Sequence, residues 1–475
     1  MPCARHRTES PPLPPAKLAI FVVAAALFME NMDSTVIATA LPAIAFDLKV
    51  EPVTLKLAFT AYLLSLAVFI PVSGWVADKF GARNVLRAAI AVFTLGSLAC
   101  GLASSLEGFV AARMLQGLGG ALMVPVGRLV VLRLLPKSEL VGAMSLLTIP
   151  ALFAPLIGPP VGGAIATFWH WRYIFLINLP IGVLGIFLAS WYVPATKEED
   201  PGPLDFFGLL YSGLGLSMLV FGSALAGSSL LERPWLVAGL LGFGASFVGI
   251  YVLHGRRVAN PLLDLSLLRL PTFRASVFGG SLFRIGIGAI PFLLPLMLQL
   301  GFGLTPFQSG SLTFVAAAGA LTMKTIAPPI LRKFGYRRVL LVNGVLSALL
   351  IAANGFFTAT TPIILMLTVL LLGGLCRSLQ FTSLNTLAFV DVETARMSRA
   401  TSLTSVAQQL SISAGVTLAA LVLEALHKSG QPLVTGDFQT AFFVVAAVSL
   451  LAQLVIMKLP KDAGASLVGS SIGNT

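Results

Sequence analysis

Two carboxylates, Glu30 and Asp33, lie three residues apart inside a long apolar segment, and no other acid lies as deep in such a segment. At helical spacing they share roughly one face. Because a charge in apolar surroundings is expensive, such an acid is a functional candidate, and burial favours its neutral form. A carboxyl group that gains and loses a proton near physiological pH is what proton-coupled transport requires. The alternative is an acid held permanently in an ion pair with Arg113 or Arg377.

Three basic residues, Arg284, Lys324 and Arg377, lie within apolar segments of the second half of the chain. The two arginines either pair with the two acids of the first half or line a cavity that receives a negatively charged substrate. Lys324 lies nearer the cytoplasmic side, and the alternative for it is a side chain that extends to the membrane surface. Gln116 and Asn385 are amides in similar segments and are further candidates for contact with a substrate. The cavity hypothesis predicts an organic anion or a metal chelate as the substrate.

A charged turn at residues 74–83 separates two apolar segments, and a degraded copy follows at residues 328–337. The copy keeps basic residues and the glycine, but Arg332 stands where the first turn has Asp78. Two such turns, about half a chain apart, predict a duplicated membrane protein. We therefore expect the two turns to share an anchoring role and to differ in gating.

The residues of the first turn suggest both a bend and a gate. Gly74 and Gly81 allow a close approach of backbones or a positive φ. Lys79 and Arg83 are expected to hold the turn on the cytoplasmic side. Asp78 can meet a helix N-terminus or an arginine from the other half. Such a contact would latch the cytoplasmic side shut.

The composition indicates that lipid is the solvent. The chain is 57% hydrophobic and 11% charged, with a mean hydropathy of +0.93, whereas a soluble domain carries about 25% charged residues. The net charge of +12 fits basic residues gathered on one side of a membrane, so no nucleic-acid partner is expected. The three cysteines predict neither a disulfide framework nor a metal site.

The motifs that would indicate other energy sources or chemistry are missing from the sequence. No phosphate-binding P-loop and no Ser-His-Asp set is found, which argues against an ATP-driven pump and against a membrane enzyme. We therefore expect no cofactor and no metal, with the proton gradient as the source of energy.

Fourteen segments are long and apolar enough to cross a membrane as helices. Most Lys and Arg residues then fall on the side of the two chain ends, which predicts a multi-pass membrane protein with both termini in the cytoplasm. The expected spans are residues 18–45, 54–76, 84–104, 107–134, 140–166, 172–193, 205–227, 235–254, 274–300, 306–330, 338–358, 361–389, 398–424 and 438–458.

The repeat and the spans together predict an all-α membrane protein of two pseudo-symmetric six-helix bundles with two extra helices between them. The expected divisions are a cytoplasmic tail (1–17), the first bundle (18–193), a linker (194–204), the extra pair (205–254), a connector (255–273), the second bundle (274–458) and a second cytoplasmic tail (459–475).

Several motifs, in order along nearly the whole chain, carry a resemblance to a known family. They are the turn at 74–83, Arg113 with Gln116 in the fourth span, Gly158, Pro159, Gly162 and Gly163 in the fifth, and residues 32–42 and 171–180 in the first and sixth. With them the chain resembles the fourteen-span drug:proton antiporters, of EmrB/QacA type, of the major facilitator superfamily.

The resemblance implies the major facilitator fold and roles for several residues. It makes Arg113 a base embedded in the membrane beside the proton path, against the alternative that its side chain extends to the membrane surface. It makes the glycine- and proline-rich stretch at 158–163 a seal against proton leak, although close helix packing alone would explain the small residues.

The expected function is proton-coupled export of small organic compounds, most simply multidrug efflux, by alternating access. Alternatives are the export of an organic anion or metal chelate by means of the buried arginines, an uptake symporter, and a membrane receptor that does not transport. The expected partners are the lipid bilayer, a small-molecule substrate and protons. We expect a monomer, with accessory efflux components as a further possibility.

Overall fold

The computed structural model describes residues 16–134, 140–195, 202–229, 233–258, 260–393, 396–426 and 433–464, and these residues form helices and no strand. Thirteen helical stretches are long and apolar enough to cross a membrane, and a shorter apolar stretch, Phe153–Phe168, lies where the fifth span is expected. The predicted all-α, fourteen-span architecture is confirmed. Most of the two expected tails and of the linker at 194–204 lies outside the described residues.

The first half of the molecule contains six spans, three of which are interrupted. A proline begins the short 3₁₀ turn η2, and another lies within the 3₁₀ turn η3. Proline interrupts a continuous α-helix because it lacks the backbone N–H group that such a helix needs. The elements are α1 (Ala16–Val36), η1 (Ile37–Ala40), α2 (Leu41–Leu48), η2 (Pro52–Leu55), α3 (Lys56–Phe69), η3 (Ile70–Val72), α4 (Ser73–Phe80), α5 (Ala82–Leu102), α6 (Leu106–Leu134), α7 (Leu140–Phe168), α8 (Tyr173–Leu176) and α9 (Asn178–Tyr192).

The remaining elements form the extra pair and the second half. The extra pair is α10 (Phe206–Ser229) and α11 (Pro234–Gly255). The second half consists of η4 (Leu265–Arg269), α12 (Pro271–Leu296), η5 (Met297–Gly301), α13 (Pro306–Phe334), α14 (Tyr336–Asn354), α15 (Ile363–Ala388), α16 (Met397–Leu426) and α17 (Thr435–Ile456).

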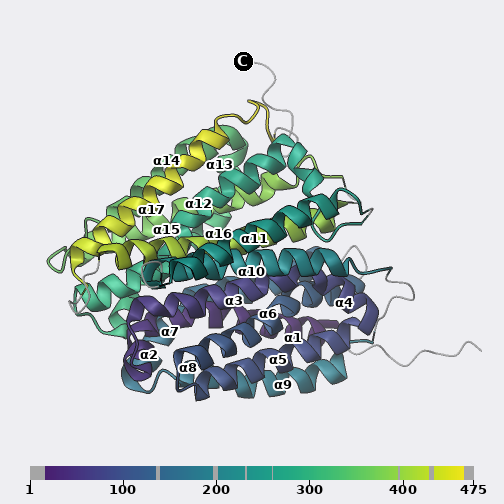
Figure 1. The fold of residues 1–475 in the computed structure, drawn as a ribbon, viewed down its shortest axis with the longest axis horizontal. Helices are drawn as coiled ribbons and strands as arrows, with labels where there is room; N and C mark the ends of the chain where they lie inside the picture. Colours follow the sequence, from purple (N-terminus) through teal and green to yellow (C-terminus); the bar gives the residue numbers. More distant parts are fainter. Residues whose placement is uncertain are drawn as a thin grey trace, which may run out of the picture.

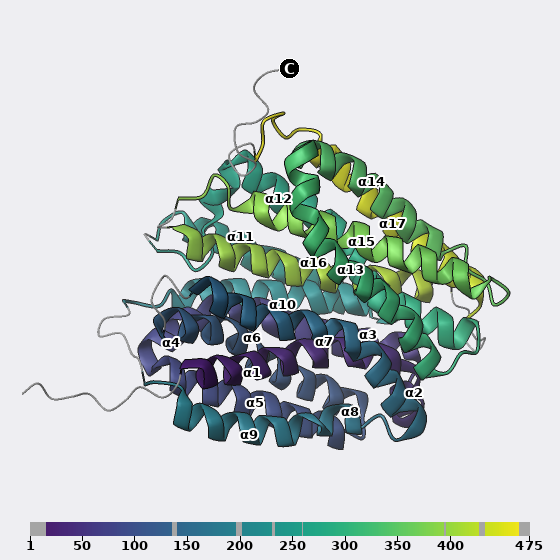
Figure 2. The same cartoon turned by 180° about the vertical axis from the view of Figure 1, so that it is seen from behind.

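The two halves lie side by side and meet along two seams. Figure 1 shows the first half in purple and blue below the second half in green and yellow, and Figure 2 shows the same division from behind. At one seam α3 packs against α16, and at the other α7 packs against α13. The extra helix α10 packs on both α3 and α16, and α11 packs on α10.

Asp205 anchors the extra pair at the start of α10. Its carboxylate accepts hydrogen bonds from the backbone N–H groups of Gly208 and Leu262 and pairs with His254 at the end of α11. Burial alone would raise the pKa of Asp205, but these hydrogen bonds and the His254 charge outweigh burial and hold the pKa below its ordinary value. The two extra helices are therefore joined through one half-buried acid.

The duplicated turns have the same backbone shape. Gly81 and Gly335, one in each turn, have φ values of 86° and 74°, a region that favours glycine. Gly74 differs from this expectation, because it lies within α4 with open space around its α-carbon and no positive φ. The prediction that Gly74 provides a close approach or a bend is therefore wrong.

The glycine-rich stretch of α7 fits between the two halves. A Cβ atom on Gly158 or Gly162 would overlap Thr35 and Val36 of α1, and one on Gly163 would overlap the backbone carbonyl of Pro306 in α13. The absence of side chains here lets α7 approach the other half at backbone contact distance.

We expect Gly163→Ala to destabilise the protein by about 1–3 kcal/mol, because an added methyl group in a tightly packed interface forces the backbone to shift. The measurement is the thermal unfolding midpoint of the purified protein in detergent, followed by tryptophan fluorescence. Gly74→Ala is the matched control and should not lower the midpoint, since its new methyl group meets open space. Equal midpoints for both variants would contradict this account of the seam.

Candidate functional site

The Asp33 carboxylate lies at the centre of a polar network buried in the first half. It accepts hydrogen bonds from Arg113 Nη1 at 2.7 Å, Gln116 Nε2 at 2.8 Å and Asn178 Nδ2 at 3.0 Å. The hydroxyl of Ser97 accepts further hydrogen bonds from Gln116 and Asn178. These residues come from α1, α5, α6 and α9, so one network joins four helices.

Arg113 lies inside the protein. Its side chain is 1% exposed, which excludes the alternative that it extends to the membrane surface. Its guanidinium carbon lies 4.3 Å from the centre of the Tyr62 ring, a distance at which the ring face attracts a cation. Of the two arginines considered as partners of Asp33, Arg113 is the one that pairs with it.

Glu30, one turn earlier on α1, has a different environment. It is buried, and its Oε1 atom accepts a hydrogen bond from the Tyr62 hydroxyl at 3.1 Å. It takes part in no ion pair with a described residue, whereas Asp33 is paired with an arginine at 2.7 Å. An unpaired buried carboxylate is more easily neutralised by a proton than one held by an arginine.

A cavity of about 400 Å³ lies between the two halves, bounded by α1, η1 and α7 on one side and by α12, α13, α15 and α16 on the other. Its walls are mainly apolar, with Leu294 and Phe381 among them. Its charged lining residues are Lys324 and Arg377, both basic. An acidic group is absent from the lining residues that the structure describes.

Three residues expected at this cavity lie elsewhere. Gln116 belongs to the Asp33 network. Arg284 is buried within the second half, where Nη2 donates to Asn385 Oδ1 at 2.8 Å. The expectation that Arg284 and Arg377 pair with the acids of the first half is therefore wrong, because Arg284 bonds an amide and Arg377 lines the cavity.

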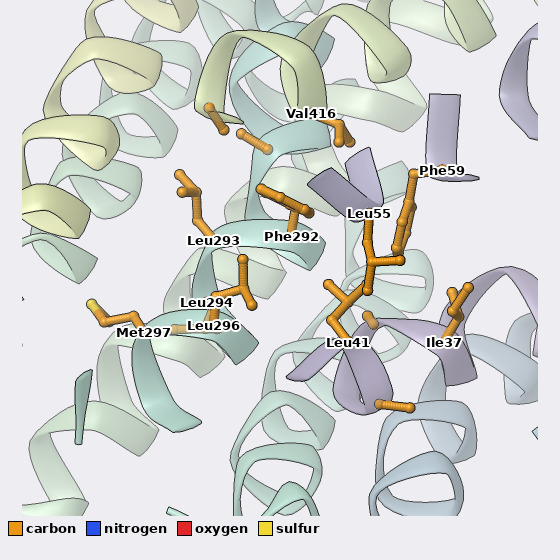
Figure 3. Packing of buried hydrophobic residues seen from close by; sticks show 14 of the residues in the cluster. Ile37, Leu41, Leu55, Phe59, Phe292, Leu293, Leu294, Leu296, Met297 and Val416 are labelled. Atoms are coloured by element: carbon orange, nitrogen blue, oxygen red, sulfur yellow. The ribbon is translucent and has the colours of Figure 1, made fainter. Parts of the chain in front are cut away.

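One end of the interface, which carries α2 and is called here the α2 end, is closed by contacts between the halves. Lys56 Nζ lies 2.6 Å from Glu424 Oε2, and the lysine side chain is 2% exposed. Gln299 Nε2 donates to the Thr39 carbonyl at 2.9 Å. An apolar contact also crosses the interface, where the rings of Phe59 and Phe292, both labelled in Figure 3, meet edge to face.

Sequence reasoning missed these contacts. Lys56 lies at the start of one expected span and Glu424 at the end of another, and neither position indicates a partner so far away along the chain. Asn178 and Ser97 were missed as well. The one available signal was that Asn178 lies within the family-like stretch 171–180.

The opposite end, which carries α4 and is called the α4 end, has no such link through Asp78. The Asp78 carboxylate pairs with Arg133 of α6 at 2.6 Å, and Lys79 Nζ lies 4.6 Å from the centre of the Trp75 ring. All four residues belong to the first half. The predicted latch to an arginine of the other half is therefore not formed in this conformation, where Asp78 instead joins α4 to α6.

Two six-helix halves with a cavity at their interface and a buried acid–arginine pair in one of them define a membrane transporter. The model of the Major Facilitator Superfamily matches residues 23–416 and 276–470. The chain belongs to this superfamily.

Curated relatives match along nearly the whole chain. The provisionally named multidrug resistance protein MdtD of Salmonella heidelberg (strain SL476) is 37% identical over 463 residues, covering 94% of this chain and 96% of the relative. Its counterpart in Salmonella paratyphi A (strain ATCC 9150 / SARB42) is 36% identical with the same coverage.

Solved structures share the fold at low sequence identity. A D-xylose-proton symporter aligns with a TM-score of 0.68 at 15% identity, covering 94% of this chain and 99% of the other. The inward-open xylose transporter XylE from E. coli aligns with a TM-score of 0.64 at 15% identity, covering 94% and 97%.

We expect Arg113→Met to destabilise the protein by about 3–5 kcal/mol, because it leaves Asp33 as an unpaired buried charge. Asp33→Asn should also destabilise it, since Arg113 loses its counter-ion. The double variant should be more stable than Arg113→Met alone. The measurement is a double-mutant cycle on the unfolding free energy in detergent. Additive effects of the two substitutions would contradict direct coupling of this pair.

Proposed function

We propose that this protein is a proton-coupled antiporter that exports small organic compounds, including drugs, by alternating access. The observation that carries the proposal is the pair of acids on α1: Asp33 is bound to Arg113, whereas Glu30 is buried and forms no ion pair with a described residue. The names of the MdtD relatives support multidrug export.

The proposed proton carrier is Glu30, while Asp33 stays bound to Arg113. Glu30 takes up a proton in one conformation and releases it in the other, and no cofactor is involved. Movement of one elementary charge through 100 mV releases about 2.3 kcal/mol, so the proton gradient can drive export. Arg113 keeps a positive charge near the proton path.

The proposed orientation follows the distribution of charge. The α4 end carries Lys79 and Arg83 and, by the positive-inside rule, faces the cytoplasm together with both termini. The α2 end then faces outward across the inner membrane. With the Lys56–Glu424 pair closing that end, the conformation corresponds to a state ready to receive substrate from the cytoplasm. The transporting unit is proposed to be the monomer.

A second candidate function is the export of organic anions or metal chelates. The charged residues that line the cavity, Lys324 and Arg377, are both basic, and Arg377 has no ion pair with a described residue. An anion in the cavity would be attracted by both groups. The uptake symporter remains less favoured, because the glycine-rich stretch of α7 resembles that of antiporters.

Everted membrane vesicles provide the test of function. Ethidium serves as the cationic probe and carboxyfluorescein as the anionic probe, and a pH-sensitive dye outside the vesicles reports coupled proton movement. We expect probe uptake into vesicles to release protons, and we expect Glu30→Gln to abolish that release because the carrier is gone. The exposed Glu107→Gln is the matched control and should behave as wild type.

Arg377→Ala separates the two candidate functions in the same vesicles. Loss of carboxyfluorescein transport with retained ethidium transport would favour the anion exporter. The drug exporter would be favoured if Arg377→Ala transported ethidium at the wild-type rate and the wild type transported no carboxyfluorescein. Probe transport by the wild type without movement of protons would contradict proton coupling.

Reversal of either charge in the Lys56–Glu424 pair should open the α2 end. Lys56→Glu or Glu424→Lys places like charges within the closed interface, where they repel each other. We expect a cysteine introduced by Leu294→Cys, in a background without other cysteines, to react several-fold faster with an impermeant maleimide from outside the cell. The double reversal should restore slow labelling. Fast labelling in the double variant would show that the pair does not close this end.

A further inference from the structure

Tyr62 on α3 contacts both acidic sites of the first half. It is 2% exposed. Its hydroxyl donates to Glu30 Oε1 at 3.1 Å, and its ring face lies 4.3 Å from the guanidinium carbon of Arg113. Arg113 in turn holds Asp33 at 2.7 Å. A single side chain therefore lies between the unpaired carboxylate and the ion pair.

Packing fixes the position of this tyrosine. A Cβ atom on Gly117 of α6 would lie 2.7 Å from the Tyr62 backbone carbonyl, and one on Gly120 would lie 3.2 Å from its hydroxyl. The two glycines make the space that the ring and its hydroxyl occupy. Because α6 also carries Arg113, a shift of the Tyr62 ring changes its contact with the helix that holds the ion pair.

We infer that Tyr62 is a positioning residue that links protonation of Glu30 to the Asp33–Arg113 pair. This inference rests on the proposed role of Glu30 as the proton carrier. A hydroxyl that donates to an ionised carboxylate forms a hydrogen bond roughly twice as strong as one to a neutral group. Uptake of a proton by Glu30 therefore weakens its hydrogen bond with Tyr62, which keeps its own proton throughout. The Tyr62 ring is then less firmly positioned, and its contact with Arg113 weakens.

Few other groups compete for this role. Three charged or titratable groups interact electrostatically with Glu30: Asp33 of the same helix, Tyr62 of α3 and Arg128 of α6. Arg113 interacts electrostatically with Tyr62. Residues 140–168 of α7 contain no titratable side chain, and α9 contains one, Tyr192, at its far end. Among these groups Tyr62 is the one hydrogen-bonded to Glu30.

The test is a pH titration of Glu30 in the purified full-length protein in proteoliposomes, followed by infrared difference spectroscopy. The carboxylic acid band of Glu30 is identified by its loss in Glu30→Gln. Tyr62→Phe removes the hydroxyl and keeps the ring over Arg113. We expect the midpoint of the band to move upward by about one pH unit, because the ionised carboxylate loses a hydrogen-bond donor.

A matched control removes a hydroxyl that lies elsewhere. Tyr251 of α11 is equally buried, and its hydroxyl bonds the backbone of Leu263. Tyr251→Phe should leave the Glu30 midpoint unchanged. Tyr62→Leu, which also removes the ring, should shift the midpoint in the same direction and lower the thermal stability further, because Arg113 loses its ring contact.

The outcomes separate this inference from the proposed function. A Glu30 band whose midpoint is the same in wild type and Tyr62→Phe would overturn the role of Tyr62, even if the vesicles show coupled transport. The role of Tyr62 would also be overturned if wild type and Glu30→Gln showed the same carboxylic acid bands, because Glu30 would then not titrate. A shifted midpoint in protein that moves no protons in vesicles would support the contact and refute the antiporter.

Discussion

The ion pair between Asp33 and Arg113 is the interaction on which the arrangement of the first half depends. Two fully buried charges are tolerated because each has the other at 2.7 Å and because amides from Gln116 and Asn178 fill the remaining positions around the carboxylate. The network draws α1, α5, α6 and α9 together. Both carboxylate oxygens of Asp33 therefore accept hydrogen bonds within this network, whereas the neighbouring Glu30 accepts one from Tyr62 among the described residues.

Contacts between the halves are distributed unevenly along the molecule. At the α2 end an ion pair, a hydrogen bond and an aromatic contact cross the interface. At the α4 end Asp78 bonds within its own half. A structure joined at one end and separated by a cavity further along is suited to rocking of one half against the other.

The sequence was sufficient for features set by local chemistry. Span positions follow from apolar length, and the duplicated turn appears in the structure as the matching φ values of Gly81 and Gly335. Pairings between distant residues were harder to predict. Arg113 was one of two partners considered for Asp33. The pairings of Lys56 with Glu424 and of Asp78 with Arg133 were not anticipated, because they depend on how the helices rotate and approach one another. Helical periodicity determines on which face of its helix a residue lies, but it does not determine which neighbouring helix that face contacts.

The position of the extra pair makes the two seams unequal. α10 lies across the seam between α3 and α16, and the seam between α7 and α13 has no counterpart to α10 among the described helices. The approximate two-fold relation between the halves is therefore broken in the plane of the bilayer. A compound dissolved in lipid meets the boundary between the halves directly on the α7–α13 side and only through additional protein on the other. The molecule thus has a front and a back toward the lipid, although both halves derive from one repeat.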